Sequence, residues 1–293
     1  MARGHPYDCG TRLTNTGDCH EPPLQESAPH GDFSMTKNEP LNNVIDRSLN
    51  YGRHLISDYL VSASRDPVKV VLDLGAGRGS DLLLARAHNP ACQLHAIEVH
   101  PEYQRELKRK GIFVHPLNIE RDSFPFRNES VDVVMANQVL EHLKEIFWVL
   151  HEATRVLRTG GRLIIGVPNL ASLHNRLLLA LGKQPTCLKN HSAHVRGYTK
   201  SDLLKLLETC FPGGYSLRQF GGSNFYPFPP TPARLLASLF PNMAWGIFLM
   251  FQKQRQYGKE FIEHPTIHRL ETNFFLGKHK RASGPVRKSV RAR

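Results

Sequence analysis

The stretch at residues 70–83 reads VVLDLGAGRGSDLL, and it predicts a strand, a tight turn and a helix in direct succession. The β-branched and leucine residues at its start suit a buried parallel strand, and the later leucines suit a helix. Glycines at positions 75, 77 and 79 permit positive φ and lack side chains that would hold a ligand away from the backbone. The start of the following helix offers unpaired N–H groups. We therefore expect a ligand to bind at this turn.

The spacing of the glycines indicates which ligand this is. The dinucleotide fingerprint G-x-G-x-x-G requires glycine at position 80, where this chain has Ser80. An acid two residues before a G-x-G-x-G run instead resembles the first motif of class I S-adenosylmethionine-dependent methyltransferases. The alternative is a glycine-rich turn with an incidental acid beside it. The resemblance implies S-adenosyl-L-methionine as cofactor, held by Asp73, Gly75, Ala76, Gly77 and Gly79.

A second stretch, FPFRNESVDVVMANQVLEHL at residues 124–143, carries a more specific resemblance. It is similar to the fourth strand of the methyltransferase type 11 group, which is related to quinone-biosynthesis enzymes. The segment RVLRTGGRLII at 155–165 is also typical of this group. Asn137 and Gln138 fall at the carboxyl end of the strand, the edge where open α/β sheets bind ligands. The resemblance implies that they and His142 contact the cofactor, although His142 could equally be a helix residue packed on the turn.

Further cofactor contacts are expected after the second and third strands. Glu98 ends the predicted strand 93–98, at the place where the resemblance implies a carboxylate on the ribose hydroxyls. After the predicted strand 113–117, the family usually has an acid on the adenine amino group and an apolar residue on the ring. This chain has Asn118 and Ile119 there. The amide is a departure, but its carbonyl can still accept a hydrogen bond from the amino group.

Together these motifs predict an α/β fold, Rossmann-like, with a seven-stranded mostly parallel sheet, helices on both faces and an antiparallel last strand. The first strand is expected at 68–74, and the fifth, sixth and seventh at 162–167, 215–220 and 244–251, the seventh as the edge strand. A turn is expected at 159–161. Helices are expected at 41–62, 79–88, 102–110, 144–157, 173–181 and 201–208.

Composition suggests how the chain is divided. Residues 1–40 show hardly any apolar periodicity and are predicted to be a disordered extension, within which Met35 could be a natural start. The resemblance implies a methyltransferase domain at 41–276, and 277–293 is predicted to be a basic disordered tail. From Lys278 onward the chain has seven basic and no acidic residues, within a formal net charge of +12. The tail could make weak contact with an anionic surface. Nucleic acid is not expected as a partner, because no RNA-binding module or base-methylation signature is recognisable.

The five cysteines are scattered and form no C-x-x-C pair, so neither a disulfide framework nor a zinc site is predicted, and no metal is expected. A reducing compartment and the absence of a signal segment favour a cytoplasmic protein. The apolar stretch 233–251 raises a membrane-anchor alternative. Arg234, Pro241 and Asn242 interrupt it, which favours a short helix followed by the seventh strand.

The segment 170–198 lies beyond the common core and is predicted to recognise the methyl acceptor. Within it, His194 is the candidate general base if the acceptor is a hydroxyl, with Tyr198 or His191 behind it. A loop histidine that orients substrate or caps a turn is the alternative. The predicted function is methyl transfer to a small-molecule, lipid-linked or glycan acceptor. A catalytically silent scaffold acting through a partner protein and an RNA methyltransferase are the competing hypotheses. The oligomeric state stays open.

Overall fold

A computed structural model of the chain describes residues 47–64 and 67–277. The predicted extension at 1–40, with Met35, and the basic tail from Lys278 lie outside the described residues. Their predicted disorder and the predicted surface contact of the tail therefore stay predictions.

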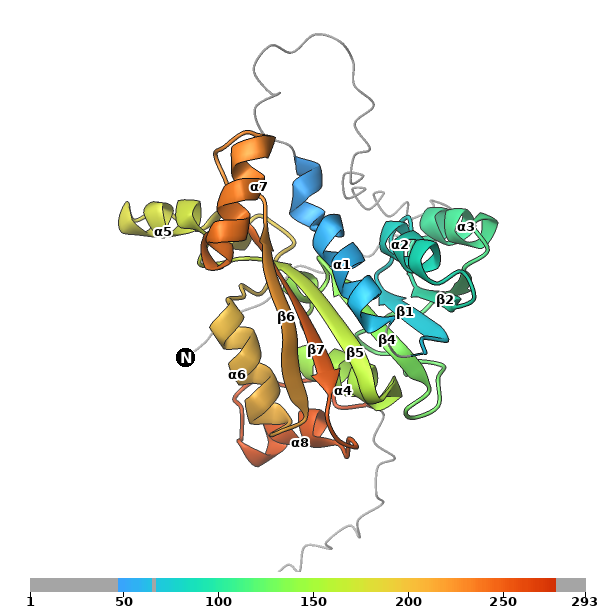
Figure 1. Cartoon of the computed structure of the whole chain (residues 1–293). Coiled ribbons are helices and arrows are strands. Elements are labelled where there is room, and N and C mark those ends of the chain that lie inside the picture. The colour runs from blue at the N-terminus through green and yellow to red at the C-terminus, as the bar shows by residue number, and fades with distance from the viewer. Residues whose placement is uncertain (1–46, 65–66, 278–293) are drawn as a thin grey trace, which may run out of the picture. The chain divides into compact units, whose positions relative to one another are not determined.

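The described residues contain a seven-stranded sheet in the order β3-β2-β1-β4-β5-β7-β6 (Figure 1). Strands β1 to β5 pair in parallel, whereas β7 runs antiparallel to both of its neighbours. This confirms the predicted α/β, Rossmann-like class. The strand order reverses between β1 and β4, and ligands bind at such a reversal, beyond the carboxyl ends of the strands. The strands are β1 Val70–Leu74, β2 Gln93–Ile97, β3 Phe113–His115, β4 Val131–Asn137, β5 Leu157–Pro168, β6 Tyr215–Ser223 and β7 Gly246–Lys253.

The prediction that the seventh strand lies at the sheet edge is wrong. Strand β7 is inserted between β5 and β6, and β6 forms the edge. Residues 246–251 are all buried, whereas most of β6 is only partly buried. An apolar run buried on both faces suits an interior strand, because neighbours on both sides then also pair its backbone groups.

Helices cover both faces of the sheet. Successive side chains of a strand point to opposite faces, so each face carries apolar side chains that a layer of helices buries. Leu72 and Leu74 of β1 pack in the larger core with residues of α4, α6 and α8, whereas Val71 packs in the second core with residues of α1, α2 and α3. Two further helices, α5 and α7, lie toward the carboxyl edge of the parallel strands (Figure 1). The helices are η2 Arg47–Tyr51, α1 Arg53–Ala63, α2 Ser80–His88, α3 Pro101–Arg109, η3 Leu140–His142, α4 Ile146–Val156, α5 Leu173–Ala180, η4 Thr186–Leu188, α6 Lys200–Cys210, α7 Pro230–Leu239, η5 Pro241–Met243 and α8 Glu260–Ile267.

Two predicted boundaries differ from the structure. Residues 41–46 of the helix expected at 41–62 lie outside the described residues. The described part is divided at Gly52, whose φ of 52° is left-handed, into η2 and α1. The turn expected at 159–161 lies inside β5, which begins at Leu157 and has an irregular register opposite Val131 and Val133. Gly160, with φ of 82°, absorbs this irregularity. Gly52 thus separates two helices, whereas Gly160 lies within a continuous strand.

The apolar stretch 233–251 contains the end of α7, then η5 and most of β7, as the short-helix interpretation predicts. Among the residues that the structure describes, no helix combines the length and apolarity needed to cross a membrane.

Candidate functional site

The glycine turn after β1 is folded tightly against the end of β2. Gly75 N donates to Ile97 O at 2.9 Å, and Gly77 N donates to the Glu98 carboxylate at 2.8 Å. Gly75, Gly77 and Gly79 all have positive φ, and Gly79 is the N-cap of α2. The turn, including Ala76, thus leads directly into the start of a helix at the carboxyl edge of the sheet, which is a favourable place for a ligand.

Three carboxylates surround this turn. Asp73, Asp81 and Glu98 are 3%, 8% and 5% exposed. Burial, followed by the charges of Asp81 and Glu98, holds the pKa of Asp73 well above its ordinary value. Glu98 also accepts a hydrogen bond from His100 N at 2.9 Å, which fixes its orientation. A ligand that carries positive charge and hydroxyl groups would relieve this concentration of negative charge.

The carboxyl end of β4 completes the same edge. Asn137 donates to Asp81 at 2.8 Å and to Tyr51 O at 3.1 Å, so the last residue of η2 is bound to this edge. Gln138 has φ of 57°, a conformation that non-glycine residues adopt mainly where the surroundings demand it. Asn137 Oδ1 and Gln138 Nε2 are buried and have no hydrogen-bond partner among the described residues. An S-adenosylmethionine molecule, which offers both donors and acceptors, fits this set of side chains.

Asn118 and Ile119 follow β3 at the same edge. The Asn118 side chain is exposed, and its oxygen accepts from Glu120 N at 2.9 Å, which closes a local turn. Ile119 is half-buried against the larger core. Their predicted contacts with adenine stay predictions.

The predicted acceptor segment closes on itself beside this edge. A bridge pairs Asn169 with Tyr198, and Leu170 N donates to Tyr198 O at 2.8 Å, so the chain leaves β5 and returns to the same point. Tyr198 is buried, its hydroxyl donates to Leu140 O at 3.2 Å, and burial raises its pKa. These contacts favour a role in fastening the loop, and the predicted role of Tyr198 in catalysis stays untested.

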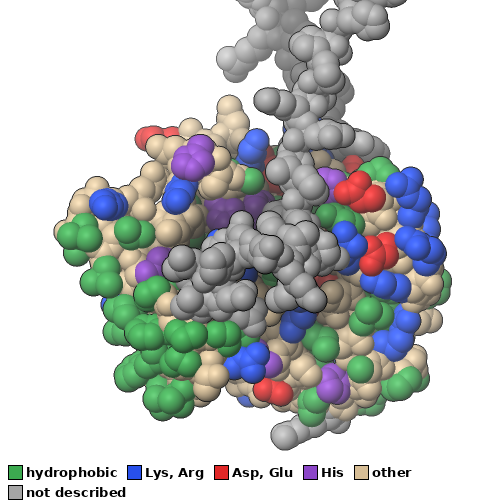
Figure 2. Space-filling view, turned by 90° about the horizontal axis from the view of Figure 1, so that it is seen from above, with side chains coloured by type: hydrophobic (Ala, Val, Ile, Leu, Met, Phe, Trp, Pro, Cys, Tyr) green, Lys and Arg blue, Asp and Glu red, His purple; other side chains and the backbone are tan. Residues whose placement is uncertain are grey.

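The candidate base His194 lies beside His142. Their ring centroids are 4.7 Å apart at 78°. His194 Nδ1 is 3.0 Å from Cys187 O, and His142 Nδ1 is 3.3 Å from Ala193 O. His191 is exposed and lies outside this pair. Histidine side chains are visible on the face of the molecule that Figure 2 shows. The structure thus brings together His142, predicted on the cofactor, and His194, predicted on the acceptor.

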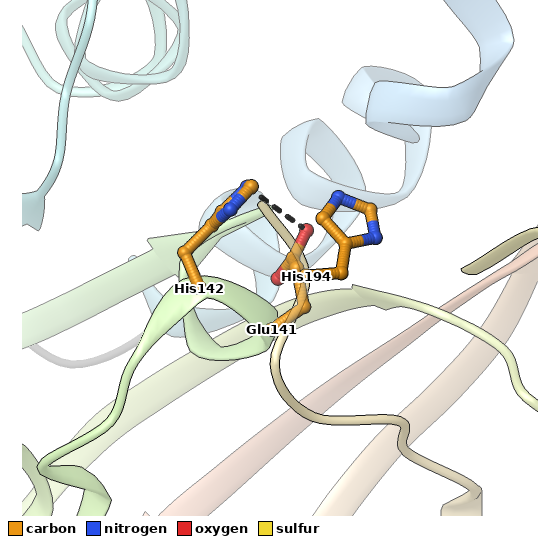
Figure 3. Close-up of side chains that lie close together, drawn as sticks. All are labelled: Glu141, His142 and His194. Carbon is orange, nitrogen blue, oxygen red and sulfur yellow. Dashed lines mark ion pairs between the residues drawn. The ribbon is translucent and has the colours of Figure 1, made fainter. Parts of the chain in front are cut away.

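Glu141 is the residue that the sequence analysis missed. It is 2% exposed, and burial raises its pKa to about 8. It lies with His142 and His194 (Figure 3). The adjacent Glu141-His142 pair was a signal that could have drawn attention to it.

Comparisons with known proteins agree with the resemblance carried by the stretches 70–83 and 124–143. Residues 72–165 match the model of a methyltransferase domain family. A probable S-adenosylmethionine-dependent methyltransferase of Mycobacterium tuberculosis (strain ATCC 25618 / H37Rv) is 27% identical over 50% of this chain and 53% of its own length. A malonyl-[acyl-carrier protein] O-methyltransferase of Herminiimonas arsenicoxydans is 32% identical over 37% of this chain and 40% of its own. An uncharacterised 37.1 kDa protein in transposon TN4556 of Streptomyces fradiae is 34% identical over 36% of this chain and 32% of its own. The matches thus span a third to about half of these relatives.

Solved structures share the fold at low identity. The plantazolicin methyltransferase BpumL, in complex with a monoazolic desmethylPZN analogue and S-adenosylhomocysteine, has a TM-score of 0.50 and 16% identity over 71% of this chain and 86% of its own. The [4+2]-cyclase SpnF has a TM-score of 0.50 and 18% identity over 69% and 81%. One fold thus serves a methyltransferase and a cyclase, and the site residues carry the distinction.

The family match begins in β1 and ends in β5, so it includes both the glycine turn with its carboxylates and the end of β4. The chain therefore carries a class I S-adenosylmethionine-dependent methyltransferase domain, with S-adenosyl-L-methionine as its cofactor.

Proposed function

We propose that this protein transfers a methyl group from S-adenosyl-L-methionine to a small-molecule, lipid-linked or glycan acceptor. The observation that carries the proposal is the convergence of Asp73, Asp81 and Glu98 on the glycine turn. Methyl transfer requires that the protein bind S-adenosyl-L-methionine, and all three carboxylates proposed to contribute to this binding are present at the turn. The relatives whose names include methyltransferase support it, and the family match at residues 72–165 includes the glycine turn.

The residues divide the work between binding and positioning. Glu98 retains lone pairs for ribose hydroxyls beside the two backbone N–H groups that it already accepts. Asp73 and Asp81 provide negative charge. Asn137 offers its unpaired Oδ1 and Gln138 its unpaired Nε2. When bound, the cofactor supplies an electrophilic methyl group, whose bond to sulfur breaks as the acceptor atom bonds to carbon. Positioning alone can be worth about 7–11 kcal/mol in such a displacement.

The segment 170–198 and α7 are the proposed acceptor region. Several of their large apolar side chains are exposed, and Figure 2 shows hydrophobic side chains gathered on one side of this face. Such a surface favours a lipid-linked acceptor among the three classes. The exposed side chains are Leu177, Leu179, Leu181, Leu235, Leu239 and Phe240. Incubation of the protein with labelled S-adenosylmethionine and separate lipid, glycan and metabolite fractions would identify the class.

Glu98→Ala tests cofactor binding directly. Hydrogen bonds to a charged group are worth about 1.5–3 kcal/mol each, so affinity for S-adenosylhomocysteine should fall roughly ten- to a hundredfold. Titration calorimetry measures this, with NADH as the control ligand. Glu102→Ala, an exposed acid in the first turn of α3, is the matched control and should bind normally. Wild-type protein that binds NADH and ignores S-adenosylhomocysteine would overturn the proposal, and binding of neither would favour the scaffold hypothesis.

A further inference from the structure

Glu141 and His142 come from one part of the chain and His194 from another, and the three side chains converge at one point. Glu141 and His142 belong to η3, which begins three residues after the end of β4, whereas His194 lies in the acceptor segment. One ligand atom from each side chain lies within 4.8 Å of the others. Figure 3 shows Glu141 between the two imidazole rings. We call these three residues the Glu-His-His cluster.

The carboxyl group of Glu141 is buried without a hydrogen-bond partner. Neither of its oxygens accepts a hydrogen bond from any described residue, and the side chain is 2% exposed. His142 Nε2 is 4.0 Å from Oε1, which is too far for a hydrogen bond. Native proteins rarely leave a buried carboxyl group in this condition, because its desolvation is then uncompensated. A cation bound between the three side chains would compensate it.

Both imidazoles are oriented as metal ligands usually are. A backbone carbonyl only accepts hydrogen bonds, so the contacts of His142 with Ala193 O and of His194 with Cys187 O place the proton on Nδ1 of each neutral ring. The lone pair is then on Nε2 of each ring. Histidines that bind metals commonly donate their other N–H to a carbonyl in this way.

Backbone contacts fasten the loop that carries His194 onto η3. Val195 N and Arg196 N donate to Glu141 O at 2.8 and 3.2 Å. The Arg196 guanidinium donates to Leu143 O and Lys144 O, both at 2.9 Å. The three side chains are therefore held together by the architecture of the loop and are preorganised for a common ligand.

We propose that the Glu-His-His cluster binds one first-row divalent transition-metal ion of the Zn²⁺ type. Two imidazoles and one carboxylate are a donor set of catalytic zinc and related ions, whereas Mg²⁺ and Ca²⁺ favour oxygen ligands. Three protein ligands leave coordination positions for water or for an oxygen of the acceptor.

The cluster lies next to the cofactor turn. Val139, two residues before Glu141, packs so closely on Gly75 that a Cβ there would lie 3.1 Å from Val139 Cγ2. The role of the ion in transfer rests on the proposed function. It would bind an acceptor hydroxyl and lower its pKa, so that the proton passes to water. The oxygen then bonds to the methyl carbon as the carbon–sulfur bond breaks and its electron pair stays on sulfur.

Metal binding by the chelator-treated full chain tests the site without any turnover. Zn²⁺, Mn²⁺ and Co²⁺ are titrated separately by calorimetry, and bound metal is counted after dialysis. His194→Ala should bind one ion fewer than wild type, or bind it at least about a hundredfold more weakly, since even outer partners of metal ligands cost 10–100-fold. His191→Ala, on the same loop but exposed, should match wild type. Glu141→Gln should behave as His194→Ala, and circular dichroism checks its fold.

Equal stoichiometry and affinity in wild type and His194→Ala would overturn the metal site. Comparing variants removes any contribution from histidines elsewhere in the chain, because that contribution is the same in both proteins. Binding of S-adenosylhomocysteine, measured on the same samples, separates the two proposals. Wild-type protein that binds the metal ion but not S-adenosylhomocysteine would refute the proposed function alone. Wild-type protein that binds S-adenosylhomocysteine but no metal ion would refute the cluster alone.

Discussion

His95 lies in β2 among other aromatic rings rather than among acids. Its ring stacks on Phe113 at 4.9 Å and meets the edge of Phe126 at 5.1 Å. Burial, and then the neighbouring His115, lower the pKa of His95 to about 4. His151 on α4 is similar, since burial lowers its pKa to about 4 although Glu152 opposes the shift. Neither residue lies among the expected cofactor-binding residues at the carboxyl edge of the sheet. We therefore expect both to affect the free energy of unfolding rather than cofactor binding.

We predict that these two histidines destabilise the fold in acid. A histidine whose folded pKa is depressed contributes fully above its unfolded value of 6.5, and the contribution is lost as pH falls from there to about 4. His95→Phe should therefore lose less stability than wild type between these pH values. Urea unfolding at several pH values measures it, with exposed His191→Phe as control. Identical pH profiles for His95→Phe and wild type would contradict the assignment.

Gly52 joins η2 to α1 and is fixed by both local geometry and a distant residue. Its N donates to Leu49 O at 3.0 Å, and its φ is 52°. A Cβ at this position would lie 2.3 Å from the ring of Phe248 in β7. Strand β7 thus helps to position the junction of η2 and α1. Tyr51, which precedes this glycine, accepts a hydrogen bond from Asn137 through its carbonyl.

We predict that Gly52→Ala destabilises the protein by about 2–5 kcal/mol. The left-handed conformation contributes about 1–2 kcal/mol and overpacking against Phe248 about 1–3 kcal/mol. Gly182→Ala is the matched control, because Gly182 has φ of 67° and open space around it. It should show the conformational cost alone. Thermal unfolding compares the two, and an equal loss in both variants would rule out the clash.

The elements that could be predicted are those whose pattern is local. The glycine turn, Asp73 and Glu98 follow from strand–turn–helix patterning, and the structure places them at one edge of the sheet. The position of β7 could not be read, because an apolar run shows burial but not its neighbours. The helix break at Gly52 depends on Phe248, which is remote in sequence. The Glu-His-His cluster depends on a loop closure at Tyr198, which leaves no periodic signal.

At the scale of the whole molecule, β7 connects the edge strand β6 to the rest of the sheet. Its partners β5 and β6 have no contact in the sheet except through it. Ile247, Leu249 and Phe251 are buried in the larger core, and Lys253 donates to Thr154 O and Leu157 O at 2.9 and 2.7 Å. Loss of three such apolar side chains at about 2–5 kcal/mol each equals the entire stability of a typical domain.

We predict that a chain ending after Met243 does not fold to a soluble monomer, because β5 then exposes a long apolar edge. A chain ending after Gly277 lacks only the basic tail and is the control. It should melt within a few degrees of the full protein and bind S-adenosylhomocysteine equally. Gel filtration and thermal melting compare the two. A soluble, cooperatively melting short chain would show that β7 is dispensable.

The interior place of β7 also has a consequence during protein synthesis. The ribosome completes β6 before β7, yet β6 pairs only with β7 and has no site on the sheet until β7 emerges. The nascent chain can therefore assemble β1 to β5, including the carboxyl edge with the expected cofactor-binding residues. The side of β5 that pairs with β7 meanwhile stays unpaired. Such an edge recruits foreign strands. The newly made chain is therefore most exposed to aggregation in the interval before residues 246–253 emerge and pair with β5.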